Sequence, residues 1–355
     1  MTKIKVFTAF SGYDSQCLAL ERLKDYSKDF DYDLIGWSEI DDVAIRAHDA
    51  LFPEFADKNY GDISQIDWQK VPDFDLFTYS SPCQDWSASG LRRGGEEGTG
   101  TRSSLLWECR KTIEIKKPDY CIMENVTGLL TKRFLPYLEK WIEELSEFGY
   151  DSWYTTLQAQ DFGIPQTRPR MFLVSIKKEL HRDFSFPSPI GECPHLYEYL
   201  DKDEDVEEWT FRKDWRREHY LEMNPNHIAE LESNPDKYAL GGYDVVPCGV
   251  YCHASDAFNR PPFRDCARTL KALSTEAGII YKRNGQWFMR LFTPRECFRL
   301  MGLTSEEYER VANAVGYKKI PKLAGNSICV NVLFHIFRKM FVDIEPERGT
   351  SYTLF

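Results

Sequence analysis

Long apolar runs are missing from this chain of 355 residues. It holds no stretch of about 18 consecutive apolar residues, so no membrane-spanning helix is expected. Residues 1–6 lack the apolar stretch of an export signal. The 10 cysteines show no short-spaced framework, so we expect reduced thiols in a cytoplasmic protein.

An excess of positive charge is also missing. The chain has 45 Lys and Arg against 56 Asp and Glu, which gives a formal net charge of -11. The net charge therefore gives no sign of nucleic-acid binding. A nucleic-acid-binding protein of this composition must have its Lys and Arg residues clustered on one surface. The length allows two domains and a sizeable core, and the charged and apolar fractions are typical of a globular protein.

The first 180 or so residues alternate apolar strand patterns with helical patterns. We expect strands at 4–7, 34–37, 74–80, 120–123, 152–157 and 170–176, and helices at 15–26, 43–51, 104–116 and 134–148. This alternation predicts an α/β fold with a mostly parallel, doubly wound, Rossmann-like sheet. There is no internal repeat.

The alternation is lost between residues 187 and 289, where Pro and Gly breaks and an acidic stretch predict a second, smaller irregular domain. Helical patterns return at 294–300, 305–315 and 328–341. Residues 1–186 and 290–355 are therefore expected to form the sheet domain, with the last helix packed against it.

Two reactive side chains follow buried strand patterns. Cys83 comes after the apolar run 74–80, and Glu124 comes after the run 120–123. In open α/β sheets, ligand-binding and catalytic sites lie at the carboxyl ends of the strands. A Cys nucleophile and a carboxylic acid there indicate covalent attack assisted by proton donation. Taken alone, Cys83 would be interpreted as a buried structural thiol and Glu124 as a surface acid. Their pairing at two strand ends favours a catalytic site.

Three further strand ends carry groups suited to an adenosine-bearing cofactor. Gly12 follows the first strand, where backbone amides can approach a ligand at a helix N-terminus. Glu39 ends the second strand, where an acid can accept from ribose hydroxyls. Asp62 follows Gly61 and could bind an adenine amino group. Each alone also fits a plain turn or a solvated loop.

Two pairs of arginines are candidates for ligand contacts. Arg92 and Arg93 lie in a glycine-rich loop after Cys83 and could grip phosphates, although a solvated loop explains them equally well. Arg168 and Arg170 open the strand at 170–176 and point the same way. They could bind a carbonyl oxygen and hold a nearby carboxylate, or form a surface charge pair.

An ordered set of short motifs links these residues. The set is Phe10-Ser11-Gly12, Glu39, Gly61-Asp62-Ile63, Pro82-Cys83-Gln84, Glu124-Asn125-Val126, Gln166 to Arg170, Leu291 to Gly302 and Gly325-Asn326-Ser327. In this ordered set of motifs the chain resembles the DNA (cytosine-5)-methyltransferase family of bacterial and phage type, over residues 1–176 and 290–340. Two positions depart from the family pattern: Asp14-Ser15 replaces a Gly pair, and Ser80-Ser81 replaces Gly-Pro.

The resemblance implies a mechanism with S-adenosylmethionine as methyl donor. Cys83 would add to carbon 6 of a cytosine flipped out of double-stranded DNA, and protonated Glu124 would donate to ring nitrogen 3. Arg170 would contact oxygen 2, and Arg168 would support Glu124. The implied cofactor residues are Phe10, Ser11, Gly12, Tyr13, Glu39, Ile40, Asp62, Ile63, Leu105, Asn326 and Ser327.

Residues 187–289 would then recognise the target sequence. The expected DNA contacts are Ser87, Arg92, Arg93, Arg212, Lys213, Arg216 and Arg217. The last four form a basic cluster among aromatics, which a solvated helix face would explain equally well. No metal site is expected, because the spacing of Cys193, His195, Cys248, Cys252 and His253 fits no standard zinc site.

We expect an active DNA-modifying enzyme of a restriction or host-protection system, monomeric, with a cognate restriction endonuclease as a further candidate partner. A tRNA cytosine methyltransferase of the same fold is an alternative, but the variable part lacks that relative's Cys-Phe-Thr signature. A catalytically inactive DNA-binding regulator is another alternative. The intact Cys83, Glu124 and arginine pair argue against it.

Overall fold

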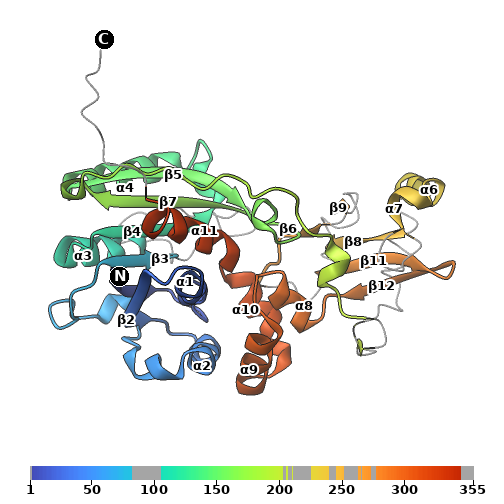
Figure 1. The fold of residues 1–355 in the computed structure, drawn as a ribbon, viewed down its shortest axis with the longest axis horizontal. Coiled ribbons are helices and arrows are strands. Elements are labelled where there is room, and N and C mark those ends of the chain that lie inside the picture. The colour runs from blue at the N-terminus through green and yellow to red at the C-terminus, as the bar shows by residue number, and fades with distance from the viewer. Residues whose placement is uncertain are drawn as a thin grey trace, which may run out of the picture. The chain divides into compact units, whose positions relative to one another are not determined.

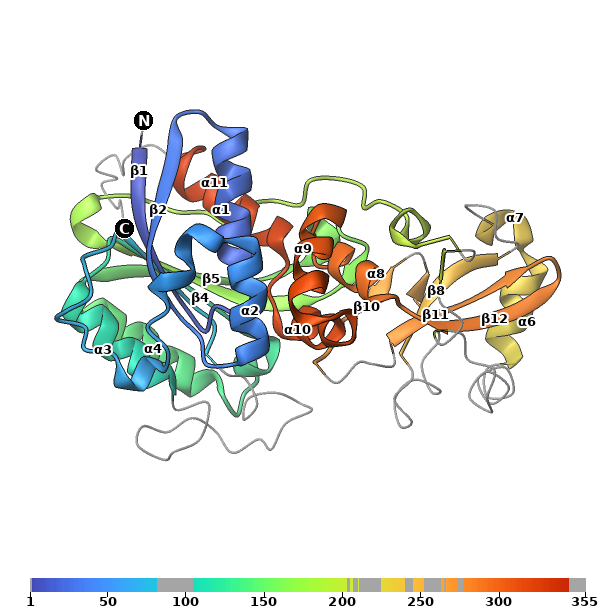
Figure 2. The ribbon, with the colours of Figure 1, turned by 90° about the horizontal axis from the view of Figure 1, so that it is seen from below.

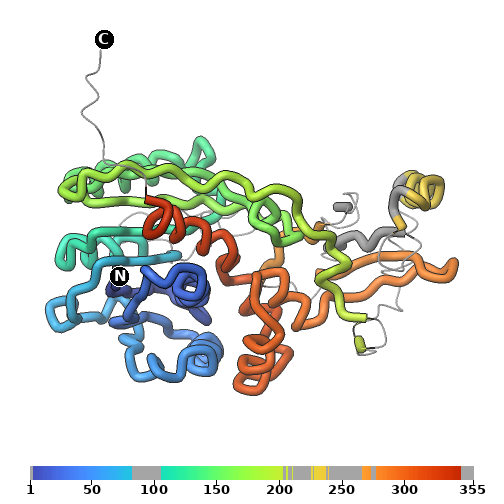
Figure 3. Tube along the Cα trace, viewed as in Figure 1, coloured from blue at the N-terminus to red at the C-terminus, as the bar shows by residue number. Residues whose placement is uncertain are grey.

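The computed structural model describes most of the chain, and Figure 3 shows most of the described residues in colour. They are 2–81, 105–202, 205–206, 210, 225–239, 245–251, 263–264, 266–272 and 277–344. The chain divides into two compact units. The first comprises residues 1–157, 169–188 and 332–355, and the second comprises 158–168 and 189–331.

A six-stranded sheet forms the centre of the first unit (Figure 1). Its strands are β1 (Thr2–Ala9), β2 (Phe30–Ser38), β3 (Leu76–Tyr79), β4 (Tyr120–Val126), β5 (Tyr150–Gln158) and β7 (Pro169–Lys177), in the order β2-β1-β3-β4-β7-β5. The β1–β2, β1–β3 and β3–β4 pairs are parallel, and β4–β7 is antiparallel. The predicted mostly parallel sheet is confirmed.

The helices of this unit are those expected from the periodicity, seen from a second side in Figure 2. They are α1 (Ser15–Tyr26), α2 (Asp42–Leu51), α3 (Leu106–Lys116), α4 (Leu135–Glu147) and α11 (Val330–Phe341), with short 3-10 turns η1 (Pro53–Lys58), η2 (Ile63–Gln65), η4 (Thr127–Leu130) and η6 (Lys178–Leu180). Phe341 of α11 stacks on Phe30 of β2 at 5.6 Å between ring centroids. The last helix therefore packs on the sheet, as predicted.

One face of the sheet is buried against α3 and α4. Phe77 and Tyr79 are two residues apart on β3, so they point to the same face, and their rings stack at 5.0 Å. Trp141 of α4 donates its indole N–H to the Tyr79 hydroxyl at 3.1 Å and packs edge-on against Trp107 of α3 at 5.7 Å. This core anchors the strand that leads towards Cys83.

The second unit contains short strands and helices. They are β6 (Gln166–Thr167), β8 (Val245–Tyr251), β9 (Phe263–Arg264), β10 (Ala267–Arg268), β11 (Ala277–Arg283), β12 (Gln286–Leu291), α6 (Pro225–Ser233), α7 (Pro235–Tyr238), α8 (Pro294–Arg299), α9 (Ser305–Val315) and α10 (Ile320–Asn326), with 3-10 turns η5 (Ala159–Phe162), η7 (Leu196–Tyr199) and η10 (Tyr317–Lys319). The β6 strand pairs with β10 in parallel, and β12-β11-β8-β9 form an antiparallel sheet.

That four-stranded sheet lies in the segment described from sequence as irregular. Its strands contain Pro247, Gly249 and Gly278, and both residue types are disfavoured inside strands. Gly278 is required by packing, because a Cβ there would overlap the backbone carbonyl of Arg290 on the paired strand. The compact units also group residues 290–331 with 189–289. The functional division at 187–289 stays a prediction.

Among the residues that the structure describes, no single helix is long and apolar enough to cross a membrane. The segments 317–326 and 330–341 pass the length and composition test only as a pair bent by 44°. The apolar side chains of α11, such as Ile336 and Phe337, are buried within the protein.

Candidate active site

The loop after β1 has an unusual backbone. Phe10, Gly12 and Asp14 all have positive φ, at 54°, 60° and 66°. Asp14 is the N-cap of α1, and its carboxylate accepts from the Cys17 amide at 3.0 Å and the Thr8 hydroxyl at 2.7 Å. Asp14 therefore holds, through its side chain, a turn that the family pattern assigns to glycine.

Glu39 ties this loop to the end of β2. One carboxylate oxygen accepts from the Gly12 amide at 2.9 Å, and the other accepts from the amides of Ile40 and Asp41 at 2.7 and 2.9 Å. Ile40 is 70% exposed, which is unusual for a large apolar side chain beside a strand end. The arrangement places a carboxylate and an apolar surface side by side at the end of β2.

The segment around Asp62 joins the same edge of the sheet. The Ser38 hydroxyl at the end of β2 donates to the Gly61 carbonyl at 2.6 Å. Asp62 is exposed and caps η2, accepting from the amide and hydroxyl of Ser64. Three loops predicted to hold a cofactor therefore meet in the structure.

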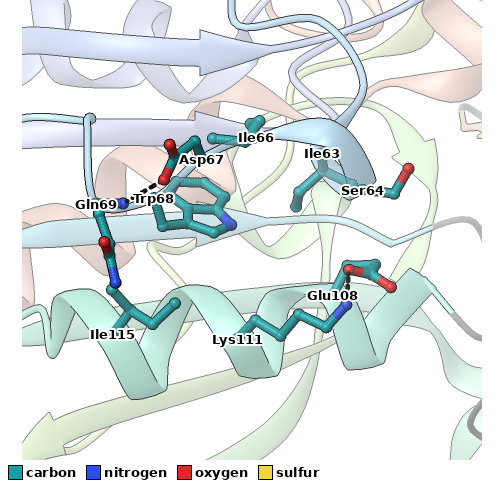
Figure 4. Close-up of a pocket in the computed structure, with 9 residues that line it drawn as sticks. All are labelled: Ile63, Ser64, Ile66, Asp67, Trp68, Gln69, Glu108, Lys111 and Ile115. Atoms are coloured by element: carbon teal, nitrogen blue, oxygen red, sulfur yellow. Dashed lines mark hydrogen bonds and ion pairs between the residues drawn. The ribbon is translucent and has the colours of Figure 1, made fainter.

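A pocket of about 240 Å³ adjoins Ile63 (Figure 4). Its lining residues are Ile63, Ser64, Ile66, Asp67, Trp68, Gln69, Glu108, Lys111 and Ile115. On the α3 side, the Lys111 ammonium donates to Glu108 at 2.8 Å, so these charges pair with each other. The pocket faces α3, the helix that starts directly after Leu105, another residue of the expected cofactor set.

The remaining expected cofactor residues differ in exposure. Phe10 and Leu105 are half-buried, whereas Tyr13 is only 1% exposed and belongs to the core. Asn326 is exposed, and Ser327 follows directly at the end of α10 in the second unit. A Cβ on the preceding Gly325 would overlap the backbone of Lys271, so this glycine is required for close packing.

Glu124 lies on β4 next to the residue that follows β3. The parallel register pairs Tyr79 with Met123, so Ser80 comes to lie beside Glu124. The Ser80 hydroxyl donates to Glu124 Oε2 at 2.5 Å, and Arg170 Nε lies 3.1 Å from Oε1. Glu124 is 6% exposed. Sequence reasoning noted Ser80 only as a departure from the family pattern and missed this contact.

The two arginines of the motif have different surroundings. Arg170 contacts Glu124, and the expected support of Glu124 by Arg168 stays a prediction. The Arg168 guanidinium is buried in the second unit and donates to the carbonyls of Leu270, Gly325 and Ser327 at 2.7, 3.0 and 2.6 Å. The first arginine of the Gln166–Arg170 motif therefore acts as a clamp on the Gly325–Ser327 motif. Two arginines spaced by two share a face only while the strand is regular, and Arg168 lies in the break between the end of β6 at Thr167 and the start of β7 at Pro169.

The signature from Leu291 to Gly302 is also organised by buried charge. Arg290 and Glu296 are fully buried and form two hydrogen bonds, at 2.8 and 2.9 Å. Glu296 further accepts from the amides of Asp201 and Thr293. A buried ion pair whose remaining lone pairs are satisfied holds one arrangement of its surroundings.

Several expected residues lie outside the described part of the chain. They are Cys83, Ser87, Arg92, Arg93, Arg212, Lys213, Arg216 and Arg217. Within the described part, no group of three or more His, Cys, Asp or Glu side chains could hold a metal ion.

The open, mostly parallel sheet, with loops gathered after β1 and β2 and an acid on β4, defines a methyltransferase of Rossmann-like fold. The model of the C-5 cytosine-specific DNA methylase family matches residues 4–342. The chain belongs to this family, and it is a DNA cytosine-5 methyltransferase.

Individual relatives agree with this assignment. The type II methyltransferase M2.ScrFI of Lactococcus lactis subsp. cremoris is 31% identical, over 95% of this chain and 99% of the relative. The orphan methyltransferase M.SssI of Spiroplasma monobiae is 27% identical, over 95% and 97%. The solved structure of the Entamoeba histolytica methyltransferase EhMeth aligns with a TM-score of 0.67 at 18% identity, over 98% of this chain and all of that chain. The structural likeness shows the fold alone.

Proposed function

We propose that the protein transfers a methyl group from S-adenosylmethionine to carbon 5 of a cytosine in a specific double-stranded DNA sequence. The observation that carries the proposal is the position of Glu124. It is buried, held by Arg170, and lies on the strand next to the one that leads towards Cys83. An acid beside a strand-end nucleophile suits addition to the cytosine ring assisted by proton donation.

The loops after β1 and β2 fit the proposed cofactor. A Cβ added at Gly12 or Gly61 would meet no heavy atom within 4 Å, so the backbone there is open to a ligand. Glu39 would accept from the ribose, exposed Ile40 and half-buried Phe10 would contact the adenine, and Asp62 with Ile63 would hold its edge. When bound, S-adenosylmethionine supplies an electrophilic methyl group.

The protein side chains would activate the cytosine. The Cys83 thiolate adds to carbon 6, and Glu124 donates a proton to ring nitrogen 3 as charge develops there. Arg170, which lies beside Glu124, would contact oxygen 2. Carbons 5 and 6 are inaccessible in a stacked duplex, so the base has to leave the helix. Carbon 5 would then take the methyl group and a base would remove the carbon 5 proton. Nitrogen 3 would return its proton to Glu124 as the Cys83 thiolate departs.

Replacing Cys83 tests this mechanism. Cys83→Ser should abolish methyl transfer and keep DNA binding, because a serine oxygen is a far weaker nucleophile at neutral pH. DNA with 5-fluorocytosine should trap the wild type covalently, because fluorine takes the place of the proton that must leave. Cys193→Ser, at a half-buried thiol of the second unit, is the control and should keep full activity. Wild-type turnover in Cys83→Ser would reject the mechanism.

We further propose that residues 187–289 determine the target sequence. A pocket for one flipped cytosine cannot read the neighbouring bases, so another surface must do so. The densest basic cluster of this segment is Arg212, Lys213, Arg216 and Arg217. Grafting 187–289 onto a relative of different specificity, followed by bisulfite mapping, should transfer the target sequence. A chimera that retained the host's target would contradict this.

The biological setting is proposed on the same basis. The protein would methylate DNA within a restriction or host-protection system, because it is similar to type II and orphan methyltransferases. A cognate endonuclease, a monomeric state and a cytoplasmic location remain predictions from the sequence.

A further inference from the structure

Ser80 occupies a position beside the proposed acid that no motif assigned to it. The β3–β4 register sets it next to Glu124, and its hydroxyl donates to Oε2 at 2.5 Å. The contact lies within the first unit and is half-buried, with Glu124 only 6% exposed. Water is therefore largely kept from the carboxyl group, and its partners decide where a proton can reside.

The two oxygens of Glu124 have partners of different chemistry. Oε1 faces Arg170 Nε at 3.1 Å, and a guanidinium can donate but cannot accept a hydrogen bond. A proton on Oε1 would point at another donor, so this oxygen suits only the unprotonated position. Oε2 faces a hydroxyl, which can both donate and accept. The acidic proton of Glu124 is therefore best placed on Oε2.

We propose that Ser80 is a positioning residue that holds the proton of Glu124 on Oε2, the oxygen that delivers it to the cytosine. This inference rests on the proposed function, in which Glu124 donates to ring nitrogen 3. Before transfer, the Ser80 oxygen accepts from the protonated Oε2. On transfer, the Oε2–H group turns from the Ser80 oxygen to ring nitrogen 3, the Oε2–H bond breaks and an N3–H bond forms. The Ser80 hydroxyl then turns to donate to the carboxylate, whose charge Arg170 pairs.

A purely structural role for Ser80 would predict something different. A hydroxyl that only supports the loop after β3 would act whether or not Glu124 can carry a proton. A hydroxyl that works through Glu124 should matter only when residue 124 is an acid. The two roles are therefore separated by a double-mutant cycle between Ser80 and Glu124.

The experiment measures single-turnover methyl transfer and covalent trapping on 5-fluorocytosine DNA. Ser80→Ala should slow both by roughly 10- to 100-fold, the effect of a lost hydrogen bond to a charged group, with DNA and cofactor affinities unchanged. Ser80→Thr, which keeps a hydroxyl, should restore the rate to within about 3-fold. In a Glu124→Gln background, Ser80→Ala should change the rate by less than about 3-fold, since the two act as one unit.

The control is Ser152→Ala. The Ser152 and Ser175 hydroxyls contact each other at 2.8 Å between β5 and β7 of the same sheet, and Ser175 pairs with Cys121 at the opposite end of β4 from Glu124. This variant should have the wild-type rate.

Three outcomes would overturn the inference. If Glu124→Gln is slow and Ser80→Ala is as fast as wild type, the Ser80 role is wrong and the proposed function stands. Equal losses from Ser80→Ala in both backgrounds would show that it acts independently of Glu124. Wild-type rates in Glu124→Gln would remove both the proposed acid and the Ser80 role.

Discussion

The surroundings of Asp14 determine how much its charge lowers the free energy of unfolding. Its side chain is fully buried, and burial raises the pKa of Asp14 to about 6, against the hydrogen bonds from Thr8 and Cys17, which lower it. His48 Nε2 lies 3.8 Å away, but burial lowers the pKa of His48 to about 3. The imidazole is neutral at neutral pH, so it does not compensate the Asp14 charge.

The sign follows from proton linkage. The folded-state pKa of Asp14, about 6, is higher than the reference value of 3.8, so the folded state binds more protons between these values. The free energy of unfolding therefore falls as pH rises through this window and stays lower above it. Each pH unit corresponds to about 1.4 kcal/mol, so ionised Asp14 costs about 3 kcal/mol at pH 7.5.

The substitution Asp14→Asn should remove this cost and keep the turn. Asparagine tolerates the left-handed backbone and caps helices as well as aspartate does. Its oxygen can accept from the Cys17 amide, and its amide group can donate to the Thr8 hydroxyl. The variant should gain up to about 3 kcal/mol at pH 7.5, and the gain should shrink to near zero by about pH 4.

Urea unfolding of wild type and Asp14→Asn between pH 4 and 7.5 provides the measurement. Asp41→Asn is the matched control, because Asp41 is also a helix N-cap that accepts from backbone amides, at the start of α2, but is only half-buried. It should show no comparable pH-dependent gain. An Asp14→Asn difference that stays constant across the pH range would refute the reasoning that burial destabilises this carboxylate.

Other predictions concern the cofactor loops and the buried clamp. Glu39→Ala and Asp62→Ala should each weaken S-adenosylmethionine binding by about 1–3 kcal/mol, and unchanged affinities in calorimetry would reject both assignments. Arg168→Ala should lower the free energy of unfolding by about 3 kcal/mol or more, because three carbonyls lose a charged donor. Arg168→Lys should recover only part of this, since an ammonium lacks the guanidinium fork, and wild-type stability in Arg168→Ala would contradict the clamp.

The periodicity of the first unit was sufficient to predict its elements. The strands at 4–7 and 34–37 lie within β1 and β2, and the helix at 15–26 has the predicted bounds. In these segments apolar residues recur with the period of a strand or helix that has one buried face, so the local pattern and the final structure agree. The sheet of the second unit was not predicted, because Gly278 satisfies a packing demand from a paired strand that periodicity does not encode.

The candidate site was predictable where chemistry follows directly from a strand end. The carboxylate of Glu39, the loop at Gly12 and the acid Glu124 lie at the carboxyl ends of their strands, as the apolar runs indicated. The carbonyl contacts of Arg168 were not predictable, since Arg168 and Arg170 differ by two positions and share a motif. The surroundings of each arginine depend on where β6 ends and β7 begins.

The sequence by itself determined the class of the protein, because ordered motifs and the alternation of strands and helices are local properties that a chain carries before it folds. Tertiary structure alone decided which groups surround the acid. The register of β3 against β4 brings Ser80 to Glu124, forty-four positions away, and the register of β4 against β7 brings Arg170 to its other oxygen. Register is set by packing across the whole sheet, so no short stretch of sequence contains it.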